Sequence, residues 1–294
     1  MRNEPLFSVL MANYNNGKYI EEAIDSICKQ TYTNWEIVIV DDGSTDDSLE
    51  ILAKYRSDAR FKIVANAENL GCGGAKRRAV KEASGELAGF LDPDDILYPE
   101  ALEIMVKEHL KHPKASLIYS TAYFCDEELN PTEKLSWVGP IPEGKSNLHV
   151  SKAGPFASFK VAKYRETEGI DPHLRRAVDQ DLYYRLEEVG DTIYIDQPLY
   201  LYRVHAGGIS TLNNVIKAKR WGFYAKKEAY LRRLHQETLA PNISLWRLFW
   251  DYRHMQYKAI RFAILHGQWN RIWTPLRTFF FTPTRKLLEY PLPE

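Results

Sequence analysis

The chain has 294 residues, of which 45% are hydrophobic and 27% charged, and these proportions exclude a disordered or low-complexity protein. It contains no run of about 18 uncharged apolar residues, so a membrane span is not expected. Its three cysteines, Cys28, Cys72 and Cys125, form no CxxC pair, which argues against a disulfide framework or a zinc site. We therefore expect a cytoplasmic protein, or one held peripherally at the inner face of the membrane.

The formal net charge of zero hides an asymmetry along the chain. Residues 211–294 carry 15 Lys and Arg against 5 Asp and Glu, a net charge of +10, and leave residues 1–210 with a net charge of −10. The same C-terminal stretch holds five of the seven tryptophans. This contrast predicts two regions with different roles, a domain over 1–210 and a basic, Trp-rich extension over 211–294.

Short apolar runs alternate with segments of helical spacing from the N-terminus. Such alternation indicates right-handed crossovers and an α/β fold, with a mostly parallel sheet flanked by helices. Strands are expected at 6–11, 35–40, 61–65, 86–91 and 116–119, and helices at 19–30, 48–55, 75–83 and 99–112.

The chain is less regular after this point. Residues 131–158 are rich in Pro, Gly and Ser, which favours loops and short strands lining an acceptor cleft. We expect a nucleotide-binding half over 1–120 and an acceptor half over 121–210. The remaining predicted elements are a helix at 177–189, strands at 192–195 and 199–204, and helices from 214 onward.

Two acidic clusters each follow a predicted strand, where sheets of this kind bind ligands. In Asp92-Pro93-Asp94-Asp95, carboxylates at i and i+2 can converge on Mg²⁺ or Mn²⁺, and such a cation can neutralise a departing diphosphate. The second cluster is Asp41-Asp42-Gly43-Ser44-Thr45-Asp46-Asp47. For both, an N-terminal cap of the following helix is the competing interpretation, and the residues alone leave it open.

Three segments in this order and spacing, SVLMANYNN (8–16), VDDGSTD (40–46) and FLDPDD (90–95), resemble glycosyltransferase family 2. Shorter motifs extend the resemblance over residues 5–210. It implies the GT-A fold, a Rossmann-like sheet flanked by helices. It also implies an inverting transferase that moves a sugar from a nucleotide sugar, with UDP favoured, to the hydroxyl of a saccharide or lipid-linked acceptor. Cell-surface polysaccharide or glycolipid synthesis is the implied setting.

The resemblance also implies roles for particular residues. Ala12 and Tyr14 match the nucleotide pocket, and Asp42, with Asp41 beside it, matches the carboxylate that accepts a hydrogen bond from the base. Lys76 matches a basic position near the donor phosphates. The implied ligands of Mn²⁺ or Mg²⁺ are Asp94, Asp92 and His205.

Asp179 matches the general base of the family. The family usually has Glu-Asp at this point, whereas this chain has Val178 before Asp179, so Asp181 is kept as the alternative base. On a helix these two positions lie about 200° apart, so only one of them can face the cleft. Attack by the acceptor hydroxyl from the far side of the anomeric carbon would invert its configuration.

Aromatic and aliphatic residues recur at helical spacing near the C-terminus, namely Trp246, Phe249, Trp250, Tyr257, Ile260 and Ile264. One interpretation places residues 241–294 on a membrane surface. The other, which we favour because such stripes are usually buried, is a helical lid or an oligomer contact that packs the aromatics against protein.

Other classes of protein also fit some of these features. A non-catalytic sugar-nucleotide-binding protein is compatible with Val178 in place of Glu. A nucleotidyltransferase would carry a Gly-rich, basic loop after the first strand, but residues 12–16 read Ala-Asn-Tyr-Asn-Asn. Nucleic-acid binding is not expected, because residues 211–294 contain no recognisable module.

Overall fold

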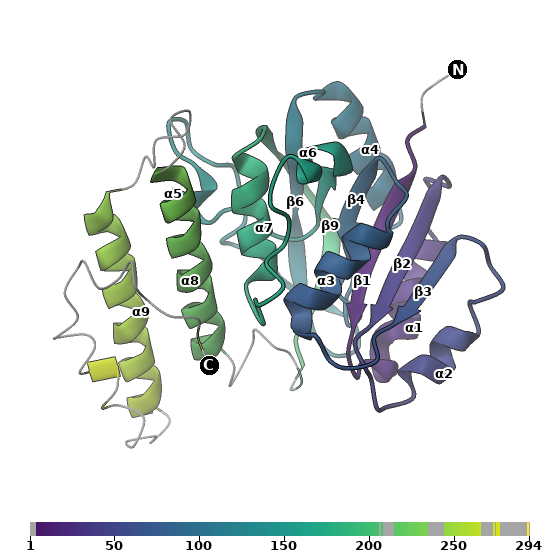
Figure 1. Cartoon of the computed structure of the whole chain (residues 1–294), viewed down its shortest axis with the longest axis horizontal. Coiled ribbons are helices and arrows are strands. Elements are labelled where there is room, and N and C mark those ends of the chain that lie inside the picture. Colours follow the sequence, from purple (N-terminus) through teal and green to yellow (C-terminus); the bar gives the residue numbers. More distant parts are fainter. Residues whose placement is uncertain are drawn as a thin grey trace.

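The computed structural model describes residues 4–205, 207, 215–234 and 244–265, together with residues 273, 275, 276 and 293. Within them, nine strands form one mixed sheet in the order β3-β2-β1-β4-β8-β6-β9-β5, with β7 paired to β6 (Figure 1). The strands are β1 (Phe7–Asn13), β2 (Trp35–Asp41), β3 (Phe61–Ala65), β4 (Leu87–Phe90), β5 (Ile96–Leu97), β6 (Ala115–Cys125), β7 (Pro131–Lys134), β8 (Ala157–Lys160) and β9 (Asp191–Arg203).

Helices cover both faces of the sheet, and α8 and α9 lie to one side of it (Figure 1). They are α1 (Gly17–Cys28), α2 (Ser48–Ala53), α3 (Gly71–Glu82), α4 (Ala101–Lys111), α5 (Asn147–Val150), α6 (Val161–Arg165), α7 (Val178–Glu187), α8 (Val215–Leu234) and α9 (Leu245–Leu265). The elements expected over residues 1–112 are all present, with ends that differ by a few residues.

The four parallel strands β3, β2, β1 and β4 form the N-terminal half of the sheet. The side chains of β1 and β2 are almost all buried, because helices cover both faces of a parallel sheet. Since β1, β2 and β4 run in the same direction, the acidic clusters that follow β2 and β4 meet at one edge of the sheet.

The second half of the sheet is mixed, which corrects the expectation of a mostly parallel sheet. Strand β8 lies antiparallel between β4 and β6, and β9 runs parallel to β6. The two strands expected at 192–195 and 199–204 are parts of the single strand β9. Its register shifts near Pro198, which cannot donate a backbone hydrogen bond.

Helices α7, α8 and α9 lie side by side, with α7 against β6 of the sheet and α9 outermost (Figure 1). Helix α9 packs on α8 through Leu248, Tyr252, Met255 and other residues of a second apolar core. The helical prediction for the extension is confirmed for residues 215–234 and 245–265, and most of 266–294 lies outside the described residues. None of the described helices has the length and apolarity that crossing a bilayer requires.

Several residues of the apolar stripe on α9 are exposed in this chain, and the interpretation favoured from the sequence, a helical lid or an oligomer contact, stays a prediction. Trp246 and Trp250 have exposed fractions of 64% and 63%, and Tyr257 and Ile264 are exposed as well. The buried face of α9 is offset around the helix from the tryptophans. This chain therefore does not bury the tryptophan stripe against itself within the described residues.

Candidate active site

A cleft of about 1370 Å³ opens at the carboxyl ends of β1, β2 and β4. Helices α3 and α7 form its middle, and the described parts of α8 and α9 line its far end. Sites for one small molecule usually measure roughly 300–1,000 Å³. This cleft therefore has room for a donor and an acceptor together.

Ala12, Tyr14 and Asp42 lie together at the β1–β2 end of the cleft, as expected for a nucleotide pocket. Asp42 is buried, and its carboxylate accepts hydrogen bonds from the backbone N–H groups of Leu70 (2.9 Å) and Gly71 (2.8 Å) at the start of α3. The amide of Asn66 also donates to Asp42 at 2.6 Å. These donors hold the carboxylate at the cleft wall, where it can accept a hydrogen bond from a base.

The expectation that Asp41 lines the nucleotide pocket is wrong, because this residue is fully buried and does not line the cleft. Its carboxylate accepts hydrogen bonds from the amide of Asn13 (2.8 Å) and the backbone N–H of Ser44 (3.0 Å). Asp41 therefore holds the loops after β1 and β2 together.

The three carboxylates of the Asp92–Asp95 turn have different surroundings. Asp94 lies 2.8 Å from the Nε2 atom of His205, whereas Asp92 is paired with Lys76 at 3.0 Å. Asp95 is buried and accepts hydrogen bonds from the hydroxyl of Tyr200 and the backbone of Arg203. Burial, with the charges of Asp94 and Asp92, raises the pKa of Asp95 well above its ordinary value. Asp95 therefore stabilises the turn that presents the other two.

The expected metal ligands are only partly brought together. In the part of the chain that the structure describes, no three His, Cys, Asp or Glu side chains form a group that could hold a metal by themselves. Asp94 and His205 nevertheless offer an oxygen and a nitrogen at the cleft, a donor pair that suits Mn²⁺. A cation held by this pair would take further oxygen ligands from the substrate.

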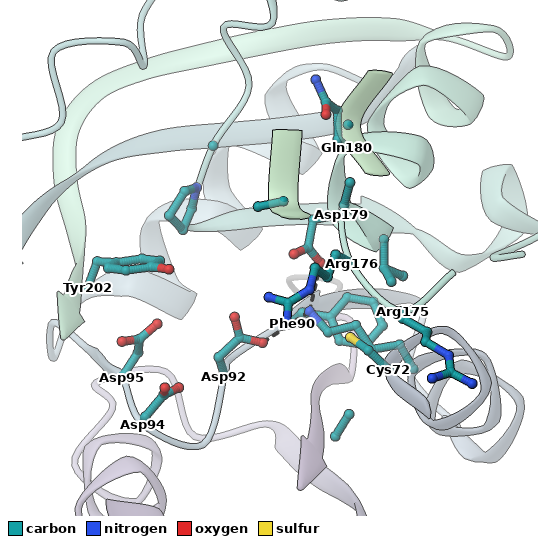
Figure 2. Close-up of a pocket in the computed structure, with 18 of the residues that line it drawn as sticks. Cys72, Phe90, Asp92, Asp94, Asp95, Arg175, Arg176, Asp179, Gln180 and Tyr202 are labelled. Carbon is teal, nitrogen blue, oxygen red and sulfur yellow. Dashed lines mark hydrogen bonds and ion pairs between the residues drawn. The ribbon is translucent and has the colours of Figure 1, made fainter. Parts of the chain in front are cut away.

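Lys76 joins the turn to α7 at the centre of the cleft. Its side chain is almost fully buried, and its Nζ lies 2.7 Å from Asp179 and 3.0 Å from Asp92. Burial would lower the pKa of Lys76, but the two carboxylates outweigh it and hold this pKa well above the ordinary value. Asp92 and Asp179 reach toward one another from opposite sides of the cleft (Figure 2). Lys76 is thus a permanent cation between them.

Asp179 and Asp181 face in different directions on α7. Asp179 lines the cleft, whereas Asp181 is buried and paired with Arg185 (2.7 Å) and Arg232 (3.3 Å). The helical geometry expected from the sequence is therefore present, and it leaves Asp179 as the candidate base. Val178, which stands where the family has Glu, is buried in the main core.

The C-terminal extension contributes to the cleft, which no motif in the sequence indicated. Residues of α8 and α9 line the same cleft as the acidic turn, among them Lys219, Lys226, His254 and Lys258. The spacing of these residues puts them on one face of each helix, but spacing alone does not show what that face meets.

Comparison with known proteins agrees with this geometry. The model of glycosyl transferase family 2 matches residues 8–166, more than half of the chain. Chondroitin synthase of Escherichia coli is 33% identical over 212 residues, which cover 71% of this chain and 30% of that protein. The chain thus spans less than a third of the length of that relative.

Two solved structures share the fold. TarS 1–349 of S. aureus in complex with UDP-GlcNAc has a TM-score of 0.63 at 19% identity, with 93% of this chain and 90% of that chain covered. The mannosyltransferase PcManGT from Pyrobaculum calidifontis, in complex with GDP-Man and Mn²⁺, has a TM-score of 0.60 at 17% identity, with 98% and 84% covered. The fold is that of the GT-A glycosyltransferases. The chain itself belongs to glycosyl transferase family 2.

Proposed function

We propose that this protein transfers a sugar from a nucleoside-diphosphate sugar, with UDP favoured, to an acceptor hydroxyl with inversion at the anomeric carbon. The observation that carries the proposal is the row Asp92–Lys76–Asp179 at the centre of a cleft with Asp42 at its nucleotide end. The UDP-GlcNAc complex of the structural neighbour TarS supports a nucleotide-sugar donor. A saccharide or lipid-linked acceptor, in polysaccharide or glycolipid synthesis, is part of the proposal.

Asp42, Lys76 and Asp179 each have one chemical task in this mechanism. Asp42 accepts a hydrogen bond from the base and orients the nucleotide. Lys76 offers a buried positive charge to the diphosphate as the bond between the anomeric carbon and the phosphate oxygen breaks. Asp179 takes the proton of the acceptor hydroxyl, whose oxygen forms the new bond from the opposite face.

We propose Mn²⁺ or Mg²⁺ as the cofactor, held by Asp94 and His205, with Asp92 close by. The contact between Asp94 and His205 at 2.8 Å supports this pair. The GDP-Man and Mn²⁺ complex of the neighbour PcManGT supports the type of ion. When bound, the cation would neutralise charge on the diphosphate leaving group.

The nucleotide site is tested first by thermal stability. UDP, GDP, CDP and dTDP are added with and without Mn²⁺ to the wild type and to Asp94→Ala, since a ligand that binds only the folded state raises the Tm. We expect metal-dependent stabilisation by one nucleotide, lost in Asp94→Ala. If no nucleotide raises the Tm under either condition, the proposal fails.

Turnover separates the proposed function from its rivals. The nucleotide sugar identified in this way is incubated with a panel of acceptors, and the phosphate products and the anomeric configuration are followed by NMR. A transferase releases a nucleoside diphosphate and inverts the donor linkage. Pyrophosphate release would establish a nucleotidyltransferase, and binding without turnover across the panel would favour a non-catalytic binding protein.

We also propose that the exposed face of α9 meets an anionic lipid surface, which places the protein at the cytoplasmic face of a membrane. Trp246, Trp250, Tyr257 and Ile264 are exposed on this helix, and residues 211–294 carry a net charge of +10. Tryptophan and basic residues together suit a membrane interface. An enzyme held there would lie close to a lipid-linked acceptor.

A further inference from the structure

Helices α8 and α9 each present one face to the cleft. On α8 this face comprises Ala218, Lys219, Gly222, Phe223 and Lys226, and on α9 it comprises Asp251, His254, Met255 and Lys258. Within each helix these residues recur three or four positions apart, so they form one continuous strip along the cleft. The strip is rich in basic groups.

The positive charge of this strip is only partly neutralised. Asp251 lies 2.6 Å from Lys226 and 3.4 Å from Arg247, so its negative charge is paired with these two residues. Among the residues that the structure describes, none forms an ion pair with Lys219 or Lys258. Lys219 and Lys258 therefore face the cleft as uncompensated cations.

The positive groups of the strip lie close enough for their charges to act on one another. Burial lowers the pKa of Lys219, and the charge of Lys258 lowers it further. Burial also lowers the pKa of His254, and the charges of Lys258 and Lys219 act in the same direction, against a smaller opposing effect of Asp251. A bound anion would relieve this repulsion and favour the charged forms of Lys219 and His254.

The strip begins next to the candidate base. A Cβ atom at Gly222 would lie 2.9 Å from the Oε1 atom of Gln180, so α8 passes directly beside the residue that follows Asp179. Lys219 stands one helical turn before Gly222. An acceptor whose hydroxyl reaches Asp179 would therefore extend past Gln180 toward Lys219, away from the nucleotide end.

We propose that Lys219, Lys258 and His254 form an acceptor subsite that binds an anionic group, a carboxylate or a phosphate, carried by the acceptor. This inference rests on the proposed glycosyl transfer, because it assigns the far end of the cleft to the acceptor. The subsite would select acidic acceptors over neutral ones of the same size.

The test is direct binding of matched probes. Affinity is measured by calorimetry, with the donor site saturated by the nucleotide that raises the Tm, for a uronate-containing disaccharide, its carboxyl-reduced neutral counterpart and a sugar 1-phosphate. We expect at least one anionic probe to bind about 10-fold more tightly than the neutral one, or about 1.4 kcal/mol. Preference for the uronate indicates a carboxylate acceptor, and preference for the sugar phosphate indicates a phosphorylated one.

Two double variants make the assignment specific. Lys219→Gln with Lys258→Gln should weaken binding of the preferred anionic probe by about 10-fold or more, since two charge-assisted contacts are lost. The control, Lys217→Gln with Arg261→Gln, removes the same charge from exposed positions outside the cleft and should leave binding within about 2-fold.

The variants must still show the Tm shift with nucleotide, which proves that the fold and the donor site are intact. Equal binding of anionic and neutral probes, no binding of either, or equal effects of the two double variants would overturn the subsite. Absence of the nucleotide shift in the wild type would instead reject the proposed function, so the two failures can be told apart.

Discussion

Asp179 and Asp181 lie only two residues apart on α7, but we expect their substitution to affect different properties. Replacing Asp179 should reduce turnover, and replacing Asp181 should reduce stability. Asp179 faces the cleft and contacts Lys76, so Asp179→Asn removes the proposed base without emptying a buried site. We expect the transfer rate to fall by about 10²- to 10⁴-fold, while the Tm shift with nucleotide is retained. Initial rates of nucleoside diphosphate release at saturating donor measure this loss.

Asp181→Asn is the matched control for this experiment. Asp181 is buried between Arg185 and Arg232, and removing its charge leaves each guanidinium with one carboxylate, Glu168 for Arg185 and Glu188 for Arg232. We expect a loss of about 3 kcal/mol in the free energy of unfolding, with turnover per folded molecule maintained. The reverse pattern, in which only Asp181→Asn abolishes turnover of folded protein, would make Asp181 the base.

Asp41 and Asp42 show how far the site could be predicted from the sequence. The cluster after β2 could be located at the edge of the cleft from the strand that precedes it. The same motif gave no reason to separate Asp42 from Asp41, which lies in β2 with its carboxylate bonded to Asn13. Which carboxylate faces the ligand depends on how the loops after β1 and β2 meet, and no local pattern records that contact.

The membrane proposal belongs to helix α9 as a whole. Replacing Trp246 and Trp250 with Ser removes two exposed indoles, so we expect at least about a 10-fold loss of partitioning to anionic liposomes and little change in stability. Co-sedimentation with phosphatidylglycerol vesicles and with neutral vesicles measures it. Leu110→Ser, an exposed apolar residue on α4, is the control and should have no effect.

Either of two results would contradict the membrane proposal. The double variant could sediment with anionic vesicles as fully as the wild type. Alternatively, the wild type could form dimers in solution that the double variant does not form, which would assign the tryptophan face to a contact between copies of this chain. Analytical ultracentrifugation without vesicles detects that second case.

The start of α3 controls the position of α7 through one glycine. Gly73 donates its backbone N–H to the carbonyl of Leu174 at 2.8 Å, and a Cβ atom there would lie 2.7 Å from that same carbonyl and also against the carbonyl of Asp171. Gly73→Ala should therefore displace the loop that leads to Asp179. We expect a loss of about 1–3 kcal/mol in stability and a lower kcat.

Chemical unfolding and steady-state rates measure both effects of Gly73→Ala. The control is Gly139→Ala, since a Cβ at Gly139 would have no described atom within 4 Å. Equal stability and activity of the two variants would show that the loop can move without consequence, contrary to the expectation.

Helices and strands could be predicted from the sequence where a local pattern of apolar residues determines them. The apolar runs of β1 to β4 and the helices between them carry their own periodicity, so their order and rough bounds follow from the sequence. The antiparallel insertion of β8 between β4 and β6 is a long-range pairing with no local signal. The burial of Tyr252 and the exposure of Trp250 on α9 likewise depend on where α8 lies, because both faces of that helix carry aromatic residues.

The stability of the whole molecule should depend on pH through a buried histidine. His109 lies on α4 and its Nε2 atom is 3.0 Å from the hydroxyl of Ser158 on β8, so it ties a helix to the centre of the sheet. Burial, and then the charge of Lys160, lowers the pKa of His109 to about 3. The folded protein therefore keeps this imidazole neutral through the mildly acidic range.

The sign of the effect follows from proton binding in the two states. In the unfolded chain the imidazole has a pKa of about 6.5, so between pH 6.5 and pH 3 the unfolded state binds more protons than the folded one. The stability that His109 contributes by remaining neutral is thus present above pH 6.5, and it is lost as the pH falls through this window. Linkage gives a loss of about 2 kcal/mol from this group between pH 7 and pH 5.

Urea unfolding at pH 7 and pH 5 tests this contribution. His109→Gln keeps a group able to reach Ser158 but cannot titrate, so its stability should fall by about 2 kcal/mol less than that of the wild type over the same interval. His112→Gln, at the C-terminal end of α4, serves as the control and should follow the wild type. If His109→Gln loses as much stability at pH 5 as the wild type, the acid sensitivity of the fold has its origin in other groups.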